Sequence, residues 1–413
     1  MKATAKKLTK KIKMKPAKVQ VKPPKKLKAT AKPKSPVESR NVPVPTRCML
    51  WGLAGGRCEF SGCNKLLLEH PVTSLQVNLA DVAHVVGFSE KGPRGEGDRP
   101  EDIHALENLM LLCPDCHTQI DERPDDFSRE SLTDYKRAHE DRIRHVTGLG
   151  PDMGTTIVQL KAKIAGRSVD IPVSHVYEAV SPRWPTDRQG FVIDLSQLDI
   201  DGAEGARAAA TVIDSATEKL YRPGMDAERT RHISLFALAP MPVLMHLGSR
   251  LSDKIAINFF QRHRDAASTP WKWRNDGPPV DFVVNRLQQG TEKAKVALIL
   301  SLSGPVDRNA LPSDITTEFS VYEMTLGGVQ ATPDFLRTAE TLERFRKRYR
   351  ALFSELAQAH GQFHELHLFP AVPAPIAVLL GHDLLPKVHP DLVAYDNDRA
   401  AGGFRFRLKI ARG

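Results

Sequence analysis

The sequence predicts a multidomain α/β protein, with a small cysteine-bearing module followed by a tandem pair of Rossmann-like units. Three observations lead to this fold class. The chain has 413 residues, 41% of them hydrophobic, which is enough for about two or three compact domains. Four of its five cysteines fall into two close pairs. Its second half contains an internal repeat of apolar strands and helices.

Residues 1–46 form a Lys-rich tail with almost no aromatic side chains. The first 47 residues carry fourteen Lys and two Arg against one Glu, so the net charge of +10 comes from this end and the remainder is mildly acidic. So little apolar surface cannot offset chain entropy, and we expect the tail to be disordered. Such a polycation attracts nucleic acid in a salt-dependent way. A solubilising spacer is an equally weighted alternative.

No apolar run approaches the roughly 20 residues of a membrane-spanning helix. The N-terminus also lacks the apolar segment of a secretion signal. We therefore expect a soluble, cytoplasmic protein with no membrane partner.

Residues 47–148 read as one compact module. Its last element is a predicted helix from Ser128 to Val146, with Ser128 as the cap and apolar side chains near helical spacing. Gly148, Gly150 and Pro151 end that helix and mark the domain boundary.

Two cysteine pairs in this module have the spacing of a metal site: Cys58 with Cys63, and Cys113 with Cys116. Two pairs of thiolates on turns can close a tetrahedral zinc site. Because cysteine fills all four positions, this Zn²⁺ is expected to be structural. Cys48 is left over and receives no role.

The same module resembles the HNH endonuclease family. The resemblance rests on Ala83-His84-Val85, on Glu107-Asn108, and on Leu112-Cys113 through Cys116-His117, together with the cysteine pairs. It implies a ββα-metal fold in which His84 is the general base and Asn108 orients it. His117 would bind the catalytic Mg²⁺ or Mn²⁺. Many relatives carry a second metal ligand where this chain has Ala83, so Asp81 becomes the candidate carboxylate.

Residues 151–413 contain the repeat, with halves at about 151–289 and 290–413. Ile233 to Pro242 parallels Leu366 to Pro375, and the register continues through Gly248 and Gly381. Each copy reads as a strand, a Pro-rich turn, a helix and a second strand. An aliphatic strand ending in Ser precedes each copy, at Phe191–Ser196 and Val296–Ser303. This alternation predicts parallel sheets buried on both faces; chance similarity is the weaker alternative.

Paired Rossmann-like units place strand ends around a pseudo-twofold axis, where a ligand of near-twofold shape fits. Backbone N–H groups and hydroxyls of small polar turns there can bind phosphates. The candidate ligand-binding residues are Ser196, Ser301, Ser303, Gly304, Pro373 and Gly381. Trp271 and Trp273 are interpreted as core residues in preference to base-stacking ones.

This half resembles the SAVED domain, a fused pair of CARF-like units, most clearly from Leu366 to Gly381 and from Pro390 to Asp396. The resemblance implies binding of a cyclic di- or trinucleotide, ligand-induced association of protomers, and degradation of double-stranded DNA in antiphage defence of the CBASS type. Two alternatives remain: a restriction-type HNH endonuclease with a DNA-reading second half, and a zinc-braced DNA-binding regulator without activity.

Overall fold

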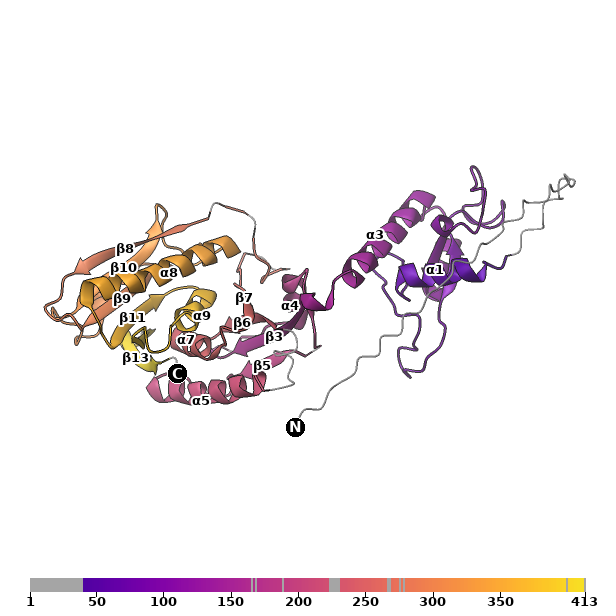
Figure 1. Ribbon diagram of the computed structural model, residues 1–413. Helices are drawn as coiled ribbons and strands as arrows, with labels where there is room; N and C mark the ends of the chain where they lie inside the picture. The colour runs from indigo at the N-terminus through magenta and orange to yellow at the C-terminus, as the bar shows by residue number, and fades with distance from the viewer. Residues whose placement is uncertain are drawn as a thin grey trace, which may run out of the picture. The chain divides into compact units, whose positions relative to one another are not determined.

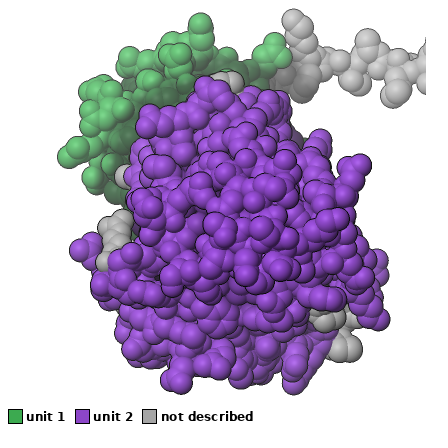
Figure 2. Space-filling view, turned by 90° about the vertical axis from the view of Figure 1, so that its left-hand side faces the viewer, with its two compact units in different colours: residues 1–143 green, residues 144–413 purple. Residues whose placement is uncertain are grey.

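The computed structural model describes residues 40–411 except 165, 168, 188, 223–230, 266–268, 275, 278 and 399. The predicted disorder of the tail therefore falls mainly outside the described residues. The chain divides into two compact units, residues 1–143 and 144–413 (Figures 1 and 2). None of the described helices is long and apolar enough to cross a membrane.

The first unit is a two-stranded antiparallel sheet surrounded by helices. Its elements are α1 (Val44–Ala54), β1 (Asp81–His84), the 3-10 turn η1 (Leu106–Asn108), β2 (Leu109–Leu112), α2 (Pro114–Glu122) and α3 (Arg129–Thr147). Every residue of β2 is buried, and its core partners include Leu50, Leu67 and Ile120. The strand–strand–helix order is that of the ββα-metal fold implied by the sequence resemblance.

Helix α1 begins inside the segment assigned to the tail. Val44, Pro45 and Thr46 belong to the helix, so the tail is shorter than its composition suggested. Proline is favoured in the first helical turn because its missing N–H has no partner there. Composition alone did not reveal this start.

Helix α3 agrees with its prediction. It covers Arg129–Thr147, and the Ser128 hydroxyl accepts a hydrogen bond from the Ser131 amide at 3.2 Å. This is the bond expected of an N-cap serine. The division between the compact units, after Ile143, falls in the last turns of this helix.

The second unit contains two mostly parallel sheets. One has the strand order β13-β12-β11-β9-β10-β8, with antiparallel strands at both edges. The other has the order β4-β3-β6-β7, and β5 also pairs with β3. The strands are β3 (Gly154–Lys161), β4 (Trp184–Pro185), β5 (Phe191–Asp194), β6 (His232–Leu238), β7 (Ala256–Phe259), β8 (Asp281–Gln288), β9 (Val296–Ser301), β10 (Ser320–Gly327), β11 (Glu365–Ala371), β12 (Asp391–Asp398) and β13 (Gly403–Ile410).

Helices and short turns connect these strands: η2 (Pro151–Met153), α4 (Val173–Val180), α5 (Ala203–Leu220), α7 (Met241–Arg250), η3 (Arg308–Ala310), α8 (Ala339–His360) and α9 (Ala374–His382). Helices α7 and α9 pack side by side, and α5 and α8 flank them (Figure 1). One continuous hydrophobic core links both sheets. Trp271 is 1% exposed and packs edge-on against Phe236, in agreement with its interpretation as a core residue.

The repeat is present in the structure, with one correction. Units β6–α7–β7 and β11–α9–β12 correspond as predicted. The strand preceding each copy was matched wrongly, because β11 pairs with β9 whereas β6 pairs with β3 and not with β5. The counterpart of β9 is therefore β3, and β5 corresponds to β10. The Ser at the end of both 191–196 and 296–303 suggested the wrong pairing.

Hydrogen bonds at the strand ends support the corrected match. The Ala162 amide, just after β3, donates to the Leu238 carbonyl at 3.1 Å. The Leu302 amide, just after β9, donates to the Ala371 carbonyl at 3.0 Å. Leu238 and Ala371 occupy the same place in the repeat. In both halves, the residue after the central strand therefore donates to the carbonyl of the equivalent residue on the neighbouring strand.

Candidate active site and sensor half

His84 ends β1 and is half-buried. Strand β1 pairs with β2 so that His84 faces Leu109 and Asp81 faces Leu112. Ala83 is 1% exposed and packs in the core, so this position carries no ligand. The antiparallel pairing therefore places the proposed base beside η1 and Asp81 beside the start of α2.

His117 lies on α2 between two carboxylates. Its Nδ1 is 3.2 Å from Asp81 Oδ2, and its Nε2 is 3.5 Å from Asp121 Oδ2. All three side chains are partly exposed, from 30% for His117 to 46% for Asp81. One imidazole and two carboxylates are a donor set that suits Mg²⁺ or Mn²⁺. The two carboxylates lie at different ring nitrogens, however, so an ion bound by His117 would meet Asp81 at Nδ1 or Asp121 at Nε2 and not both through the same nitrogen.

Asn108 is buried at the end of η1 and acts on the backbone that follows His84. Its side-chain oxygen accepts from the Val86 amide at 2.7 Å, and its amide nitrogen donates to the carbonyls of Val86 at 3.2 Å and Ile103 at 2.9 Å. Its own carbonyl accepts from the Val85 amide. Asn108 thus fixes the backbone that follows His84.

His104 is the nearest polar neighbour that the structure gives His84. Its Nδ1 lies 3.3 Å from His84 Nε2, and its ring stacks on Phe88 with 5.7 Å between centroids. His104 is 9% exposed, and its amide bonds the Asp102 carboxylate. No sequence motif surrounds His104.

The pKa of His84 is lowered to about 4. Burial is the largest cause, and the nearby His104, His117 and Arg99 add to it because each disfavours a second positive charge. A neutral imidazole at physiological pH has a free lone pair. His84 is therefore in the protonation state that a general base requires.

Three arginines hold the loop between β1 and η1. Arg94 donates to the Val85 carbonyl at 3.2 Å and to Asp121 Oδ1 at 2.9 Å, so it connects the residue after His84 to the carboxylate beside His117. Arg99 bonds three loop carbonyls, and Arg129 on α3 bonds three more. These contacts fix the walls of the site from residues that carry no recognised motif.

The four paired cysteines meet at one point. Their sulfurs all lie within 4.8 Å of one another, and the Cys63 and Cys113 sulfurs are 4.0 Å apart. Tetrahedral zinc with Zn–S bonds of about 2.3 Å separates its sulfurs by about 3.8 Å. The Cys113 amide also donates to the Cys58 sulfur at 3.3 Å. The spacing and chemistry of the donors fit structural zinc.

This cluster connects the loop after α1 to the start of α2. Cys113 precedes the first residue of α2, and Cys116 lies in its first turn, so the cluster fixes the helix that carries His117. Burial raises the pKa of Cys58 to about 12. A buried thiolate there needs a cation beside it. Cys48 is exposed and lies outside the cluster.

Asp121 and His104 are the site residues that sequence analysis missed. Asp121 had a usable signal, because it follows His117 by one helical turn and such residues share a helix face. His104 had none, since only the folding of the loop brings it to His84.

The ligand-binding candidates of the second unit do not form one group. Ser303 and Gly304 follow β9 and are partly accessible. Ser301 is 3% exposed, and its hydroxyl donates to Glu323 Oε1 at 2.6 Å, so it braces β10. Pro373 is buried at the start of α9. Ser196 follows β5, which belongs to the other sheet.

Gly381 does not line a strand end. It lies in the last turn of α9, where a Cβ would overlap the Met245 carbonyl of α7. Its lack of a side chain serves helix packing, and we remove it from the ligand candidates. Ser196, Ser303 and Gly304 are the members of the set that are partly exposed.

Comparisons with known proteins agree with both resemblances. Residues 58–123 match the HNH endonuclease family model. Residues 216–410 match the model of SAVED, the SMODS-associated and fused to various effectors sensor domain. No curated protein is similar enough in sequence to match.

Similar solved structures include Cap4 SAVED/CARF-domain containing receptors. The Acinetobacter baumannii receptor with the cyclic trinucleotide 2'3'3'-cAAA is 13% identical, with a TM-score of 0.41 over 75% of this chain and 64% of that one. The Moraxella osloensis receptor is 14% identical, with a TM-score of 0.36 over 72% and 58%. This chain thus spans less than two thirds of the length of either receptor.

The family matches fall on the two parts that the structure separates. The HNH match contains the residues around His84 and the four cysteines, and the SAVED match contains the second copy of the repeat with most of the first. The chain therefore joins an HNH endonuclease domain to a SAVED sensor domain.

Proposed function

We propose that this protein is a metal-dependent endonuclease that cuts double-stranded DNA when its SAVED domain binds a cyclic oligonucleotide, and that it acts as an antiphage effector of the CBASS type. The observation that carries the proposal is that His84 lies within electrostatic range of His117, which contacts two carboxylates, in a chain that also contains a sensor domain. A hydrolytic site and a sensor domain in one chain are what an enzyme needs if binding of a ligand to the sensor is to control its activity.

His84 takes the proton of the attacking water. Its lowered pKa keeps the imidazole neutral, and its position at the end of β1 leaves it partly accessible. Asn108 holds the following backbone, so the ring is presented from a fixed strand. A positioned general base contributes about 10²–10⁴-fold to a rate.

His104 positions the base. A hydrogen bond between His84 and His104 restricts the His84 ring and selects which nitrogen carries the proton. Because both rings border Phe88, one face of the pair is shielded from water. His104 is accordingly a positioning residue for His84.

His117 and Asp81 would hold the Mg²⁺ or Mn²⁺ ion on the Nδ1 side of the imidazole, while Asp121 faces the other ring nitrogen. When bound there, such an ion supplies charge stabilisation for the phosphate and the leaving oxygen. Arg94 keeps Asp121 in place through its 2.9 Å hydrogen bond, and it is only 5% exposed at its side chain. The two candidate ligands thus come from different elements, Asp81 from β1 and His117 from α2.

Double-stranded DNA is the proposed substrate. The first 47 residues hold sixteen basic side chains against one acidic side chain, so this end of the chain attracts a polyanion. Basic and acidic side chains nearly balance in residues 151–413, so the second half is not notably basic, and the alternative of a DNA-reading second half gains no support from its charge. A restriction-type enzyme would need a basic surface on its recognition domain.

A cyclic di- or trinucleotide is the proposed activator. The solved receptor from A. baumannii binds a cyclic trinucleotide, and this chain shares its SAVED family. Ser303 and Gly304 after β9 are partly exposed polar groups at a strand end, and Ser196 is a partly exposed group at a strand end of the other sheet. Ligand-induced association of protomers would then bring HNH domains together on DNA.

Plasmid cleavage by the purified protein tests the proposal. The assay contains Mg²⁺ or Mn²⁺ and a panel of cyclic di- and trinucleotides, with His84→Ala as the inactive control. We expect nicking or linearisation with one or two ligands only, and its loss in the variant. Cleavage without any ligand would favour the restriction-type alternative. A protein that binds DNA but never cuts it would favour the inactive regulator.

A further inference from the structure

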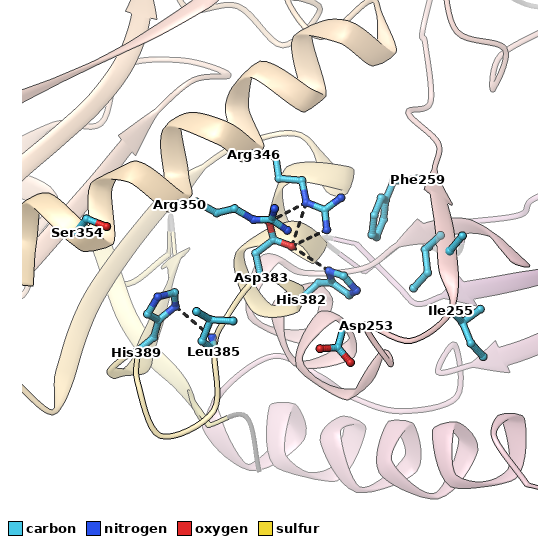
Figure 3. A pocket seen from close by; sticks show the side chains of 12 residues that line it. Asp253, Ile255, Phe259, Arg346, Arg350, Ser354, His382, Asp383, Leu385 and His389 are labelled. Carbon is cyan, nitrogen blue, oxygen red and sulfur yellow. Dashed lines mark hydrogen bonds and ion pairs between the residues drawn. The ribbon is translucent and has the colours of Figure 1, made fainter. Parts of the chain in front are cut away.

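A pocket of about 540 Å³ lies in the SAVED half, between β7, α8 and the C-terminal end of α9 (Figure 3). Its size is within the range of about 300–1,000 Å³ that small-molecule sites occupy. Ser196, Ser301, Ser303, Gly304 and Pro373 do not line it. Of these candidates, Pro373 lies at the start of α9, next to Ala374, whereas the pocket lies at its other end, near His382. A helix of this length separates the two by about 13 Å.

A buried carboxylate orders two arginines at this pocket. Asp383 has a side chain that is 1% exposed, and it faces Arg346 and Arg350 from successive turns of α8. Arg346 donates through Nε and Nη2, with distances from 2.8 to 3.1 Å. Arg350 donates through Nε alone, at 2.8 Å. Figure 3 shows both guanidinium groups meeting at Asp383.

The two arginines differ in how many guanidinium N–H groups are not used in hydrogen bonds to Asp383. Asp383 accepts hydrogen bonds from Nε and Nη2 of Arg346, and the Arg346 side chain is 22% exposed. Arg350 is 56% exposed, and within the described chain no protein group pairs with its terminal amino groups. Asp383 therefore holds Arg350 through Nε. The two terminal amino groups, which we call the outer fork, remain for another partner. Such a fork matches a phosphate in geometry and charge.

Apolar side chains form the remaining wall. Ile255, Ile257 and Phe259 come from the β7 segment, and Leu385 comes from the loop after α9. Phe259 also packs edge-on against His382, with 5.7 Å between the rings. A ligand with a phosphate and a flat apolar group could place the phosphate against the arginine side and the apolar group against this wall. A nucleotide has this chemistry.

The local charge favours an anion only modestly. Arg346 and Arg350 face Asp383 and the exposed Asp253, while burial lowers the pKa of His389 and favours its neutral form. A purely structural ion-pair network joining α8 to α9 is therefore the competing interpretation. The two interpretations make different predictions for Arg350. A structural network needs only its bond to Asp383, whereas an anion site also needs its two terminal amino groups.

We propose that this pocket binds a phosphorylated nucleotide, with the phosphate on the outer fork of Arg350 and the base against Ile255, Ile257 and Phe259. The site is separate from the strand-end candidates and from the HNH domain. It goes beyond the proposed nuclease function, since ligand binding here is measured without DNA or cleavage. A linear nucleotide and the cyclic messenger share this chemistry, and the experiment distinguishes them.

Isothermal titration calorimetry of the full-length protein with AMP, ATP and a panel of cyclic di- and trinucleotides tests the proposal. Arg350→Ala removes the fork. The matched control is Arg348→Ala on the same helix, whose guanidinium pairs with Glu355 at 2.9 and 3.0 Å and does not line the pocket. Both variants lose one positive charge, so their difference reports the pocket and not net charge.

We expect at least one nucleotide to bind, with affinity lowered about tenfold or more by Arg350→Ala and little changed by Arg348→Ala. If Arg350→Ala weakens the binding of AMP or ATP, the pocket's ligand is a linear nucleotide. If it weakens only the binding of cyclic ligands, the pocket's ligand is the cyclic messenger. Circular dichroism and thermal unfolding establish that the variants are folded. If no nucleotide binds, or if both variants bind equally, the network is structural and the proposal is overturned.

Discussion

Gly248 on α7 and Gly381 on α9 make the same contact from opposite sides of the helix pair. A Cβ at Gly248 would overlap the Val378 carbonyl, and a Cβ at Gly381 would overlap the Met245 carbonyl. Met245 and Val378 are themselves equivalent in the repeat. The pseudo-twofold axis of the SAVED domain therefore passes between these helices, and both glycines are required for their close approach.

Gly248→Ala and Gly381→Ala should each destabilise the SAVED half. Because backbone, and not a flexible side chain, occupies the space of the new methyl group, the helices must separate. Overpacking of this kind costs about 1–3 kcal/mol. Chemical denaturation measures the loss. Gly304→Ala is the control, since nothing lies within 4 Å of its added Cβ. Unchanged stability in both helix variants would contradict the close crossing.

Cys116→Ser should release zinc and unfold the HNH domain. Structural zinc in small domains contributes about 10–16 kcal/mol of apparent binding free energy, which exceeds what a small core supplies. Metal analysis by mass spectrometry and limited proteolysis report the two effects. Cys48→Ser is the matched control, because Cys48 is exposed and outside the cluster. Zinc retained at full stoichiometry in Cys116→Ser would be incompatible with a four-sulfur site.

Cleavage should persist to unusually low pH. Only neutral His84 accepts a proton, and its pKa of about 4 means that the rate falls only as pH approaches that value. His104→Ala removes the second-largest cause of the lowered pKa, so the acidic limb should move to higher pH. Initial rates measured across pH, with folding checked by circular dichroism, test this. The exposed His145→Ala is the control; an identical limb in all three proteins would remove His104 from the mechanism.

Asp383→Asn should destabilise the SAVED half far more than an exposed acidic residue does. Burial by itself raises the pKa of Asp383, but hydrogen bonds from His382, Arg346 and Arg350 outweigh it and hold the pKa below its usual range. Breaking a buried pair costs about 3–5 kcal/mol. Asp281→Asn, which loses an exposed pair with Arg344, should cost less than about 1 kcal/mol.

The sign of the Asp383 effect with pH follows from its lowered pKa. The stabilisation is fully present above the usual aspartate pKa and is lost as pH falls through the lower folded-state value. Wild-type stability should therefore drop in acid, and the drop should be smaller in Asp383→Asn. Denaturation curves at several acidic pH values measure it. Parallel losses in both proteins would show that Asp383 is not the group responsible.

Local spacing was sufficient for each cysteine pair and for the Ser128 cap, because short turns and helical spacing fix which neighbours in the chain meet. The roles of His84, Asn108 and His117 came from the resemblance to the HNH family, since these residues are too far apart in the chain for spacing to relate them. The repeat was equally visible as a pattern of strands and helices. Its first strand was misassigned, since strand pairing depends on the sheet and both β3 and β5 are apolar.

Only the tertiary structure decided which distant residues act together. His104 reaches His84 through a long loop held by arginines, and Arg350 meets Asp383 across two helices. Neither pair has a spacing that a sequence reveals. Gly381 reads as a helix end in sequence, yet its role is set by a carbonyl on α7. The sequence determined the domains and their motifs; the packing of loops and helices decided the contacts, because those depend on separations through space that the order of residues does not encode locally.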